Sequence, residues 1–341
     1  MNHRSDQAGT LESSRTATPR RRVALIVLYR GPFVPYFPLF LASCAGNPDY
    51  TWLFLTDQPA PANAPPNVRF LPITAAEVNE RIGDVLGVRT AITKPYKYID
   101  LRPMYGVLFA DHLRGYTHWG HGDIDVILGR LRDFLTDDLF DRYPRVQTSG
   151  HLSIYRNTDE VNHYYTLEAP GVPTWRNVLA DPDHFFVFDE WPGINRILDY
   201  HRIPSYHGAP IADIDALSPR MTVYREPNRR VQAFYHHDGR IVQQFAADAS
   251  GRAESRDFAY MHLRKRRLPA PAFDRIPELG YFITPQGFVP RESEACDAAT
   301  LRRMNRPSLD HALFLLQWRS SNLWRKLTGR HRPPPLREPV A

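Results

Sequence analysis

Two aspartates separated by one residue interrupt an apolar segment, and they are the residues in this chain best suited to chemistry. Asp123 and Asp125 lie within the segment 118–129. In an extended backbone, residues i and i+2 project to the same side, so both carboxylates can converge on one cation while Ile124 faces the core. Carboxylate oxygens suit Mg²⁺ or Mn²⁺, which usually keep positions for water and substrate phosphates. The spacing fits equally well with two aspartates that cap a turn or a helix beginning near Arg130.

The segments before these aspartates alternate between strand and helix patterns. Three apolar runs predict buried strands, at residues 23–28, 51–55 and 68–71. Three segments predict helices, at residues 36–44, 74–86 and 100–113, with Thr74 as an N-cap. This order predicts right-handed crossovers and a mostly parallel sheet. Ligands bind beyond the carboxyl ends of such strands, so Thr56 and Asp57 should share an edge with the two aspartates.

Patterns in the second half add a smaller antiparallel part. Strands are predicted at 152–155 and 258–263, and a hairpin joins 231–235 to 241–245 through Asp238-Gly239. A helix over 189–201 would open with two acidic residues, which suits its N-terminal dipole. The predicted fold is α/β, with a mostly parallel central sheet flanked by helices and a small antiparallel addition.

The chain divides into three parts by composition. Residues 1–20 are polar and aperiodic and predict a disordered leader, and residues 21–290 predict one α/β domain. Residues 291–341 predict an amphipathic helix over 308–328 and a basic, proline-rich tail. One face of this helix would carry apolar residues, namely Leu309, Leu313, Leu316, Trp324 and Leu327.

Charge and composition limit the classes of function. The formal charge is +6, which permits attraction to nucleic acid, anionic lipid or phosphorylated substrates, but no nucleic-acid motif accompanies it. Two cysteines, Cys44 and Cys296, fit a reducing compartment, and neither a signal sequence nor a spanning apolar run is present. We expect a cytoplasmic protein, with peripheral contact at the inner face of the membrane as a further hypothesis. The absence of GxGxxG, GxxxxGK and GxSxG patterns disfavours dinucleotide enzymes, kinases and serine hydrolases.

The most specific pattern is the acidic segment together with the stretch from Lys94-Pro95-Tyr96-Lys97 to Tyr105-Gly106 that precedes it. Further matching segments are residues 23–27, 52–57, 150–157 and 188–190. Over about residues 21–270 the chain resembles a bacterial family that is encoded among polysaccharide-synthesis genes and regarded as GT-A type glycosyltransferases. The resemblance implies a GT-A like fold and a nucleoside diphosphate sugar as donor.

The resemblance also implies a metal site. Asp123 and Asp125 would hold Mn²⁺ or Mg²⁺ against the donor diphosphate, with Asp125 as the direct ligand and Asp123 on the ribose or a metal-bound water. His262 resembles the late histidine that completes this site in many GT-A enzymes. The alternative for His262 is a histidine at the core edge that is paired with a backbone carbonyl.

Other residues resemble the donor-binding positions of GT-A enzymes. These are Tyr29, Thr56, Asp57, Lys97, Asp100, Arg102 and Arg264, with Lys265 beside the last. For Asp100 and Arg102 the competing interpretation is a buried structural pair. Lys97, Arg264 and Lys265 could equally face water. Tyr29 could pack against the protein instead of contacting the donor.

Asp189 and Glu190 resemble the acidic pair that GT-A enzymes present from the acceptor side, and they are the predicted catalytic residues. Such a carboxylate serves as general base in an inverting enzyme or steadies the sugar in a retaining one, and helix capping is the alternative. His121 is expected to orient the acidic turn. His151 and Asn157 either line the acceptor cleft or hydrogen-bond to loop backbone.

The sequence thus favours a metal-dependent glycosyltransferase that acts on a cell-surface glycan or a lipid-linked acceptor. A metal-dependent phosphoesterase would use similar acids, although usually more of them. A non-catalytic protein that binds a glycan or a membrane surface is the second alternative.

Overall fold

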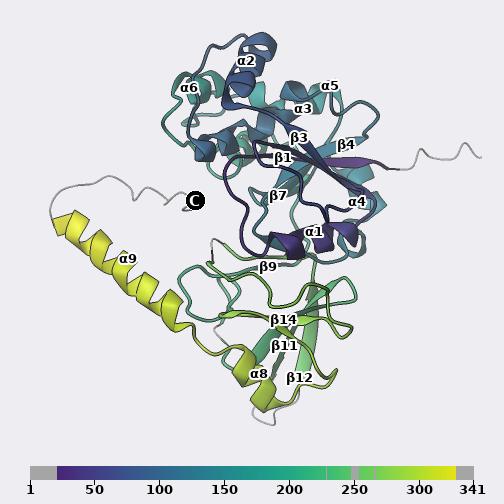
Figure 1. Ribbon diagram of the computed structural model, residues 1–341. Coiled ribbons are helices and arrows are strands. Elements are labelled where there is room, and N and C mark those ends of the chain that lie inside the picture. The colour runs from purple at the N-terminus through teal and green to yellow at the C-terminus, as the bar shows by residue number, and fades with distance from the viewer. Residues whose placement is uncertain (1–20, 228, 247–252, 265, 328–341) are drawn as a thin grey trace, which may run out of the picture.

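The computed structural model describes residues 21–227, 229–246, 253–264 and 266–327, and the predicted leader 1–20 and the tail 328–341 lie outside them. A seven-stranded sheet with helices on both faces forms one part of the molecule, and a five-stranded antiparallel sheet forms the other (Figure 1). A short three-stranded sheet completes the arrangement. The predicted α/β class is therefore confirmed.

The seven-stranded sheet is mostly parallel in its first half. Its strands, in spatial order, are β3 (Val68–Pro72), β2 (Tyr50–Thr56), β1 (Val23–Tyr29), β4 (His118–Gly122), β7 (Leu152–Arg156), β6 (Arg145–Ser149) and β8 (Ser205–Tyr206). β1 runs parallel to both β2 and β4, whereas β7 is antiparallel to β4 and to β6. The carboxyl ends of β1, β2 and β4 consequently share one edge, as predicted.

Both faces of this sheet are buried, which explains the uninterrupted apolar runs. Successive side chains of β1 alternate between two cores: Ile26 packs in the core of Ile82 on α2 (Ala75–Leu86), and Leu25 packs in the core of Phe40 on α1 (Phe37–Ala45). Thr74 and Glu77 form a capping box at the start of α2, as the sequence predicted for Thr74. The remaining helices of this part are α3 (Tyr105–Leu108), α4 (Asp137–Arg142), α5 (Asp159–Asn162), α6 (Trp175–Ala180) and α7 (Ile194–Tyr200).

Three predicted elements differ from the structure. The helix predicted over 100–113 is a 3₁₀ helix, Pro95–Met104, followed by the single turn of α3, because Pro103 has no N–H with which to extend an α-helix. The helix predicted from Asp189 begins only at Ile194 with Gly193 as N-cap, so the two acidic residues do not cap it. The strand predicted over 258–263 is divided into β12 (Ala253–Phe258) and β13 (Tyr260–His262). Two further 3₁₀ turns cover Leu131–Asp133 and Tyr164–Thr166.

The antiparallel sheet is larger than the small addition that the sequence predicted. Its order is β12, β11 (Arg240–Ala246), β10 (Gln232–His237), β14 (Tyr281–Thr284) and β15 (Gly287–Pro290). The predicted hairpin turn is confirmed, since Asp238 and Gly239 have φ of 47° and 69° between β10 and β11. α8 (Ala298–Met304) packs on this sheet, and α9 (Leu309–Leu327) projects from it (Figure 1). Within the described residues, no helix combines the length and apolar character needed to cross a membrane.

The three-stranded sheet determines the geometry of the candidate site. β13 lies at its centre, antiparallel to β5 (Val126–Leu128) and parallel to β9 (Ile211–Asp213). His262 at the end of β13 pairs in register with Val126 and with Asp213. The loop that contains Asp123 and Asp125 leads directly into β5. Residues far apart in the sequence therefore meet where these three strands end or begin.

Candidate active site and metal centre

Asp123, Asp125, Asp213 and His262 form a cluster that we call the acidic corner. One donor atom from each of Asp123, Asp125 and His262 lies within 4.8 Å of the others. Nε2 of His262 is 3.5 Å from Oδ1 of Asp125 and 4.0 Å from Oδ2 of Asp123. The backbone fixes this approach, because the amide of Leu263 donates to the carbonyl of Asp125 at 2.9 Å. Two carboxylates and one imidazole fit a cation such as Mn²⁺ and leave positions for other ligands.

Asp213 orients His262 from the opposite side of the ring. Its Oδ1 lies 2.9 Å from Nδ1 of His262, so Nε2 points toward Asp123 and Asp125. A carboxylate that holds a metal-binding histidine in this way fixes its tautomer and raises its basicity. Burial lowers the pKa of His262, but Asp125, Asp213 and Asp123 raise it, and the result is about 10. The ring is thus a cation at neutral pH when no metal replaces its proton.

The sequence interpretation missed Asp213. A signal for it exists, because Asp213-Ile214-Asp215 is a second Asp-x-Asp triplet at the end of a short apolar segment. Only the parallel pairing of β9 with β13 shows that Asp213 belongs to the acidic corner.

His151 lies beside His262, with ring centroids 4.2 Å apart. With Asp213 and His262 it forms a second group whose donor atoms lie within 4.8 Å. Its Nδ1 is 2.8 Å from the hydroxyl of Tyr260, and burial holds its pKa well below the usual range. This neutral imidazole therefore lines the acidic corner rather than bonding only to loop backbone.

Arg102 connects the acidic corner to Asp189. Its Nη2 donates to Asp123, and its Nη1 donates to Oδ2 of Asp189 at 2.9 Å and to the carbonyl of Gly150 at 2.8 Å. Arg102 and Asp189 are both buried, so the contact between them is shielded from water. Arg102 does form a buried pair with an aspartate, but its partner is Asp189 and not Asp100, so it bridges the two sets of predicted site residues.

Asp189 and Glu190, which we call the acidic pair, lie against Gly150. The amide of Gly150 donates to Oε2 of Glu190 at 3.0 Å, and a Cβ at Gly150 would lie 2.9 Å from Oδ2 of Asp189. Asp189 is only 2% exposed. Burial raises its pKa, Arg102 lowers it and Glu190 raises it, and the result is about 7. His121, also buried, places Nδ1 3.1 Å from the Gly150 carbonyl, so it helps to hold this turn.

Lys97 and Asp100 form a buried ion pair of 2.9 Å. Lys97 also donates to the carbonyls of Val178 and His184, both at 2.8 Å, and Asp100 accepts from the amides of Phe186 and Phe188. The structure does not bring these two predicted donor-binding residues to the acidic corner. They instead anchor the segment 184–188 that leads into the acidic pair.

Tyr29, Thr56 and Asp57 lie at the carboxyl ends of β1 and β2, as predicted. The hydroxyl of Tyr29 donates to the carbonyl of Pro32 at 2.8 Å, and burial with the charges of Asp125 and Asp57 raises its pKa to about 12. Thr56 is buried. Asp57 accepts from the amide of Gly31 at 3.2 Å and lies 3.2 Å from Arg30.

Arg264 borders the acidic corner, with Nη1 3.4 Å from Oδ2 of Asp213 and its guanidinium over the ring of Tyr224. Lys265 lies outside the described residues. Asn157 donates to the carbonyls of Leu113 and Tyr116, which confirms the expected alternative that it bonds loop backbone.

Residues 25–292 match the family of unknown function DUF6625, and this match covers most of the chain. The chain belongs to the DUF6625 family. No curated protein matches it. The DUF6625 region contains the acidic corner, Arg102 and the acidic pair.

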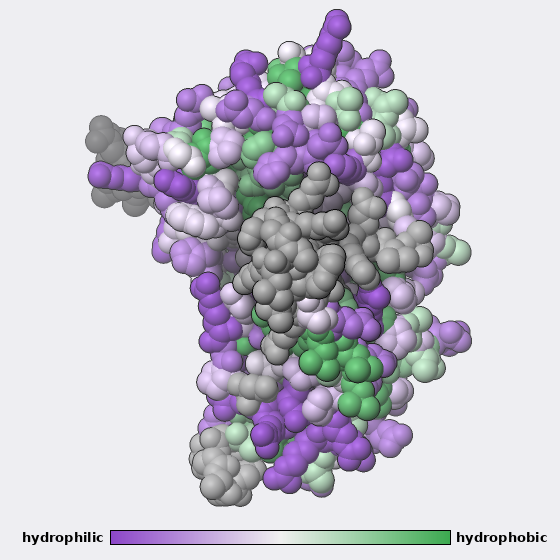
Figure 2. All heavy atoms as spheres, turned by 90° about the vertical axis from the view of Figure 1, so that its left-hand side faces the viewer, coloured by the Kyte–Doolittle hydropathy of each residue, from purple (hydrophilic) through white to green (hydrophobic). Residues whose placement is uncertain are grey.

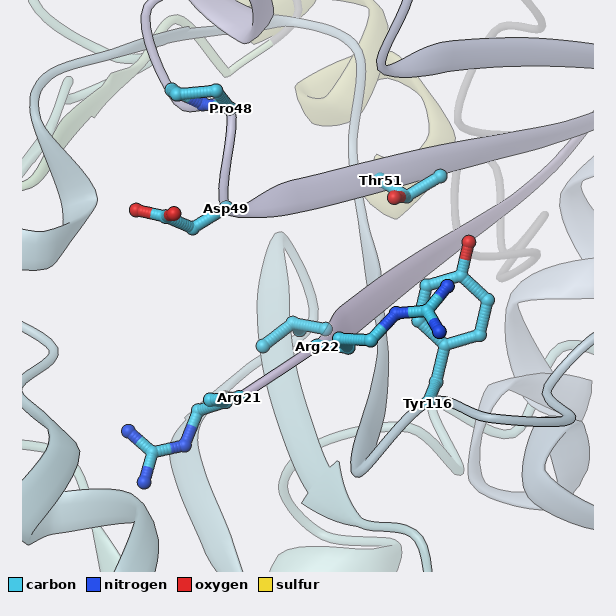
Figure 3. A pocket seen from close by; sticks show the side chains of 7 residues that line it. Arg21, Arg22, Pro48, Asp49, Thr51 and Tyr116 are labelled. Atoms are coloured by element: carbon cyan, nitrogen blue, oxygen red, sulfur yellow. The ribbon is translucent and has the colours of Figure 1, made fainter. Parts of the chain in front are cut away.

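A pocket of about 280 Å³ lies elsewhere in this DUF6625 protein (Figure 3). It is lined by Arg21, Arg22, Val23, Pro48, Asp49, Thr51 and Tyr116. These residues surround the amino ends of β1 and β2, roughly 20 Å along the strands from the acidic edge at 3.3 Å per residue. The guanidinium of Arg22 lies 5.0 Å from the ring of Tyr116, and Arg21 pairs with Asp141 at 2.9 Å. Both arginines of this pocket already contact other side chains, so we take the acidic corner, and not this pocket, as the candidate functional site.

Proposed function

We propose that this protein is a metal-dependent glycosyltransferase with a GT-A fold, which transfers a sugar from a nucleoside diphosphate sugar to a glycan or lipid-linked saccharide. The observation that supports it most strongly is the link between the acidic corner, whose side chains could hold a metal ion, and the acidic pair. Arg102 forms that link, with Asp123 on one side and Asp189 on the other. The location at the carboxyl edge of a mostly parallel sheet supports the same proposal.

Asp123, Asp125 and His262 would hold Mn²⁺ or Mg²⁺ in this reaction, and Asp213 would keep His262 oriented. A bound cation would supply positive charge that stabilises the negative charge developing on the departing nucleoside diphosphate. Arg264, which already lies 3.4 Å from Asp213, can approach the same diphosphate from the side of β13.

The acidic pair would act on the acceptor side. Glu190 is more exposed than Asp189, so its carboxylate is the better placed to meet an acceptor hydroxyl. Asp189 is almost fully buried and tied to Arg102, which makes it the residue that positions the guanidinium. This division assigns proton transfer to Glu190 and orientation to Asp189.

A metal-dependent phosphoesterase is the competing function, because His151, Asp213 and His262 form a second possible ligand group. Both groups require His262, however, and its Nδ1 is already bonded to Asp213. A single imidazole nitrogen remains for a metal, which disfavours a two-metal hydrolytic site.

Incubation with UDP-, GDP- and dTDP-sugars in the presence of Mn²⁺ tests the proposal, with products separated by chromatography. With water as the surrogate acceptor of the sugar, we expect release of intact nucleoside diphosphate that is lost on chelation and in Asp125→Ala, but kept in the matched control Asp215→Ala. The control removes an aspartate that accepts from the amide of Leu217 rather than from His262. Release of inorganic phosphate would instead favour the phosphoesterase, and no consumption of any donor would contradict the glycosyltransferase.

A further inference from the structure

α9 is a 19-residue helix, Leu309–Leu327, that projects from the antiparallel part of the molecule (Figure 1). Its first turns contact the body through one side only. Nε2 of His311 lies 2.8 Å from the carbonyl of Ala216, and Leu315, one turn later on the same side, is buried. The opposite side of the helix is therefore presented to the surroundings.

Three leucines occupy that opposite side. Leu309, Leu313 and Leu316 are 78%, 58% and 62% exposed. Their spacing of four and three residues places them on one helical face, and the sequence continues it with Trp324 and Leu327. Figure 2 shows hydrophobic side chains gathered on the side of the molecule that carries α9. A continuous stripe of large, solvent-exposed apolar side chains indicates a surface that binds a partner.

The net charge of the C-terminal segment that contains α9 indicates the kind of partner. Residues 308–341 contain six lysines and arginines and two acidic residues, so the segment is distinctly more basic than the chain as a whole. An anionic lipid surface complements the charge and also accepts the leucines.

We propose that α9 lies in the interface of an anionic lipid bilayer, with Leu309, Leu313 and Leu316 inserted among the lipids. β1 starts at the right of Figure 1, so the carboxyl edge of the sheet faces the side on which α9 projects. Docking through α9 would therefore turn the acidic corner toward the membrane side. This inference does not depend on the proposed glycosyltransferase activity, and its test does not measure activity.

Sedimentation of the full chain with lipid vesicles tests the inference. Vesicles of phosphatidylglycerol and phosphatidylcholine are compared with vesicles of phosphatidylcholine alone, each at low and high salt. We expect binding to the anionic vesicles that weakens with salt, and that falls at least about tenfold in the double variant Leu313→Glu with Leu316→Glu. The double variant Val85→Glu with Val289→Glu is the matched control, since it adds the same charge at exposed apolar positions on α2 and β15.

Equal loss in the two double variants would overturn the inference, because charge alone would then explain the result. Failure of the wild type to sediment with anionic vesicles would also overturn it. The oligomeric state is measured in parallel by light scattering. A wild-type dimer that the Leu313→Glu, Leu316→Glu variant dissociates, without vesicle binding, would assign the leucine face to a second copy instead. Circular dichroism checks folding, which these exposed positions should preserve.

Discussion

Metal binding at the acidic corner should release one proton per cation, because His262 must lose a proton to become a ligand. Burial opposes protonation of this ring, but the carboxylates of Asp125, Asp213 and Asp123 hold its pKa at about 10. At any pH below that value the metal competes with a proton for Nε2. The apparent affinity should therefore rise about tenfold per pH unit between pH 6 and 9, which corresponds to about 1.4 kcal/mol per unit.

Isothermal titration of Mg²⁺ in buffers of different ionisation enthalpy measures this proton release directly. Asp213→Ala removes the acceptor that lies 2.9 Å from Nδ1, so it should lower the pKa of His262 and reduce the release measured near neutral pH. Asp215→Ala should leave the release unchanged, since its carboxylate bonds the amide of Leu217. Metal binding that is independent of pH in the wild type would refute the assignment of His262 as a ligand.

Three further predictions concern the residues that support the site. Lys97→Met should lower the free energy of unfolding by about 3–5 kcal/mol in chemical denaturation, because it removes the partner of the buried Asp100. Lys94→Met, which breaks an exposed ion pair, should cost less than about 1 kcal/mol. Equal effects would contradict a stabilising role of the buried pair. Gly150→Ala should displace the acidic pair, because the added Cβ would lie 2.9 Å from an oxygen of Asp189 and 3.2 Å from an oxygen of Glu190. We expect donor turnover to fall by at least about tenfold while the melting temperature changes little. Unchanged turnover would contradict a catalytic role of the acidic pair. Burial lowers the pKa of His118 to about 4, whereas the histidine of the unfolded chain takes up its proton below about pH 6.5. The free energy of unfolding should therefore fall by up to about 3 kcal/mol as the pH is lowered from 6.5 to 4. His118→Phe should remove this part of the pH dependence, and an unchanged slope in the variant would contradict the prediction.

Local signals in the sequence predicted the parts of the fold that local physics determines. The apolar run of β1 reflects burial on both faces, Thr74 caps α2, and Asp238-Gly239 forms the hairpin turn. The same reasoning was wrong for the helix over 100–113, where Pro103 favours a 3₁₀ helix. The cap and the hairpin turn each depend on one local steric or hydrogen-bonding cause, so they were predictable. The irregular segment 95–108 has no such single cause and was not.

The candidate site was predictable only in outline. The spacing of Asp123 and Asp125 is compatible with a cation site as well as with capping of a turn. The contribution of Asp213 depends on strand pairing between residues 49 positions apart. Likewise, nothing local to Arg102 indicates that it reaches both Asp123 and Asp189. Such partners arise from long-range packing, which a single sequence does not encode in its local pattern.

The most direct test of the central claim is calorimetric titration of UDP and GDP into the full chain, with and without Mn²⁺. The proposal predicts binding of one nucleotide that requires the cation and is lost in Asp125→Ala, while Asp215→Ala binds as the wild type does. Nucleotide binding that ignores both Mn²⁺ and Asp125, or no binding to a folded wild type, would contradict a metal-dependent donor site at the acidic corner.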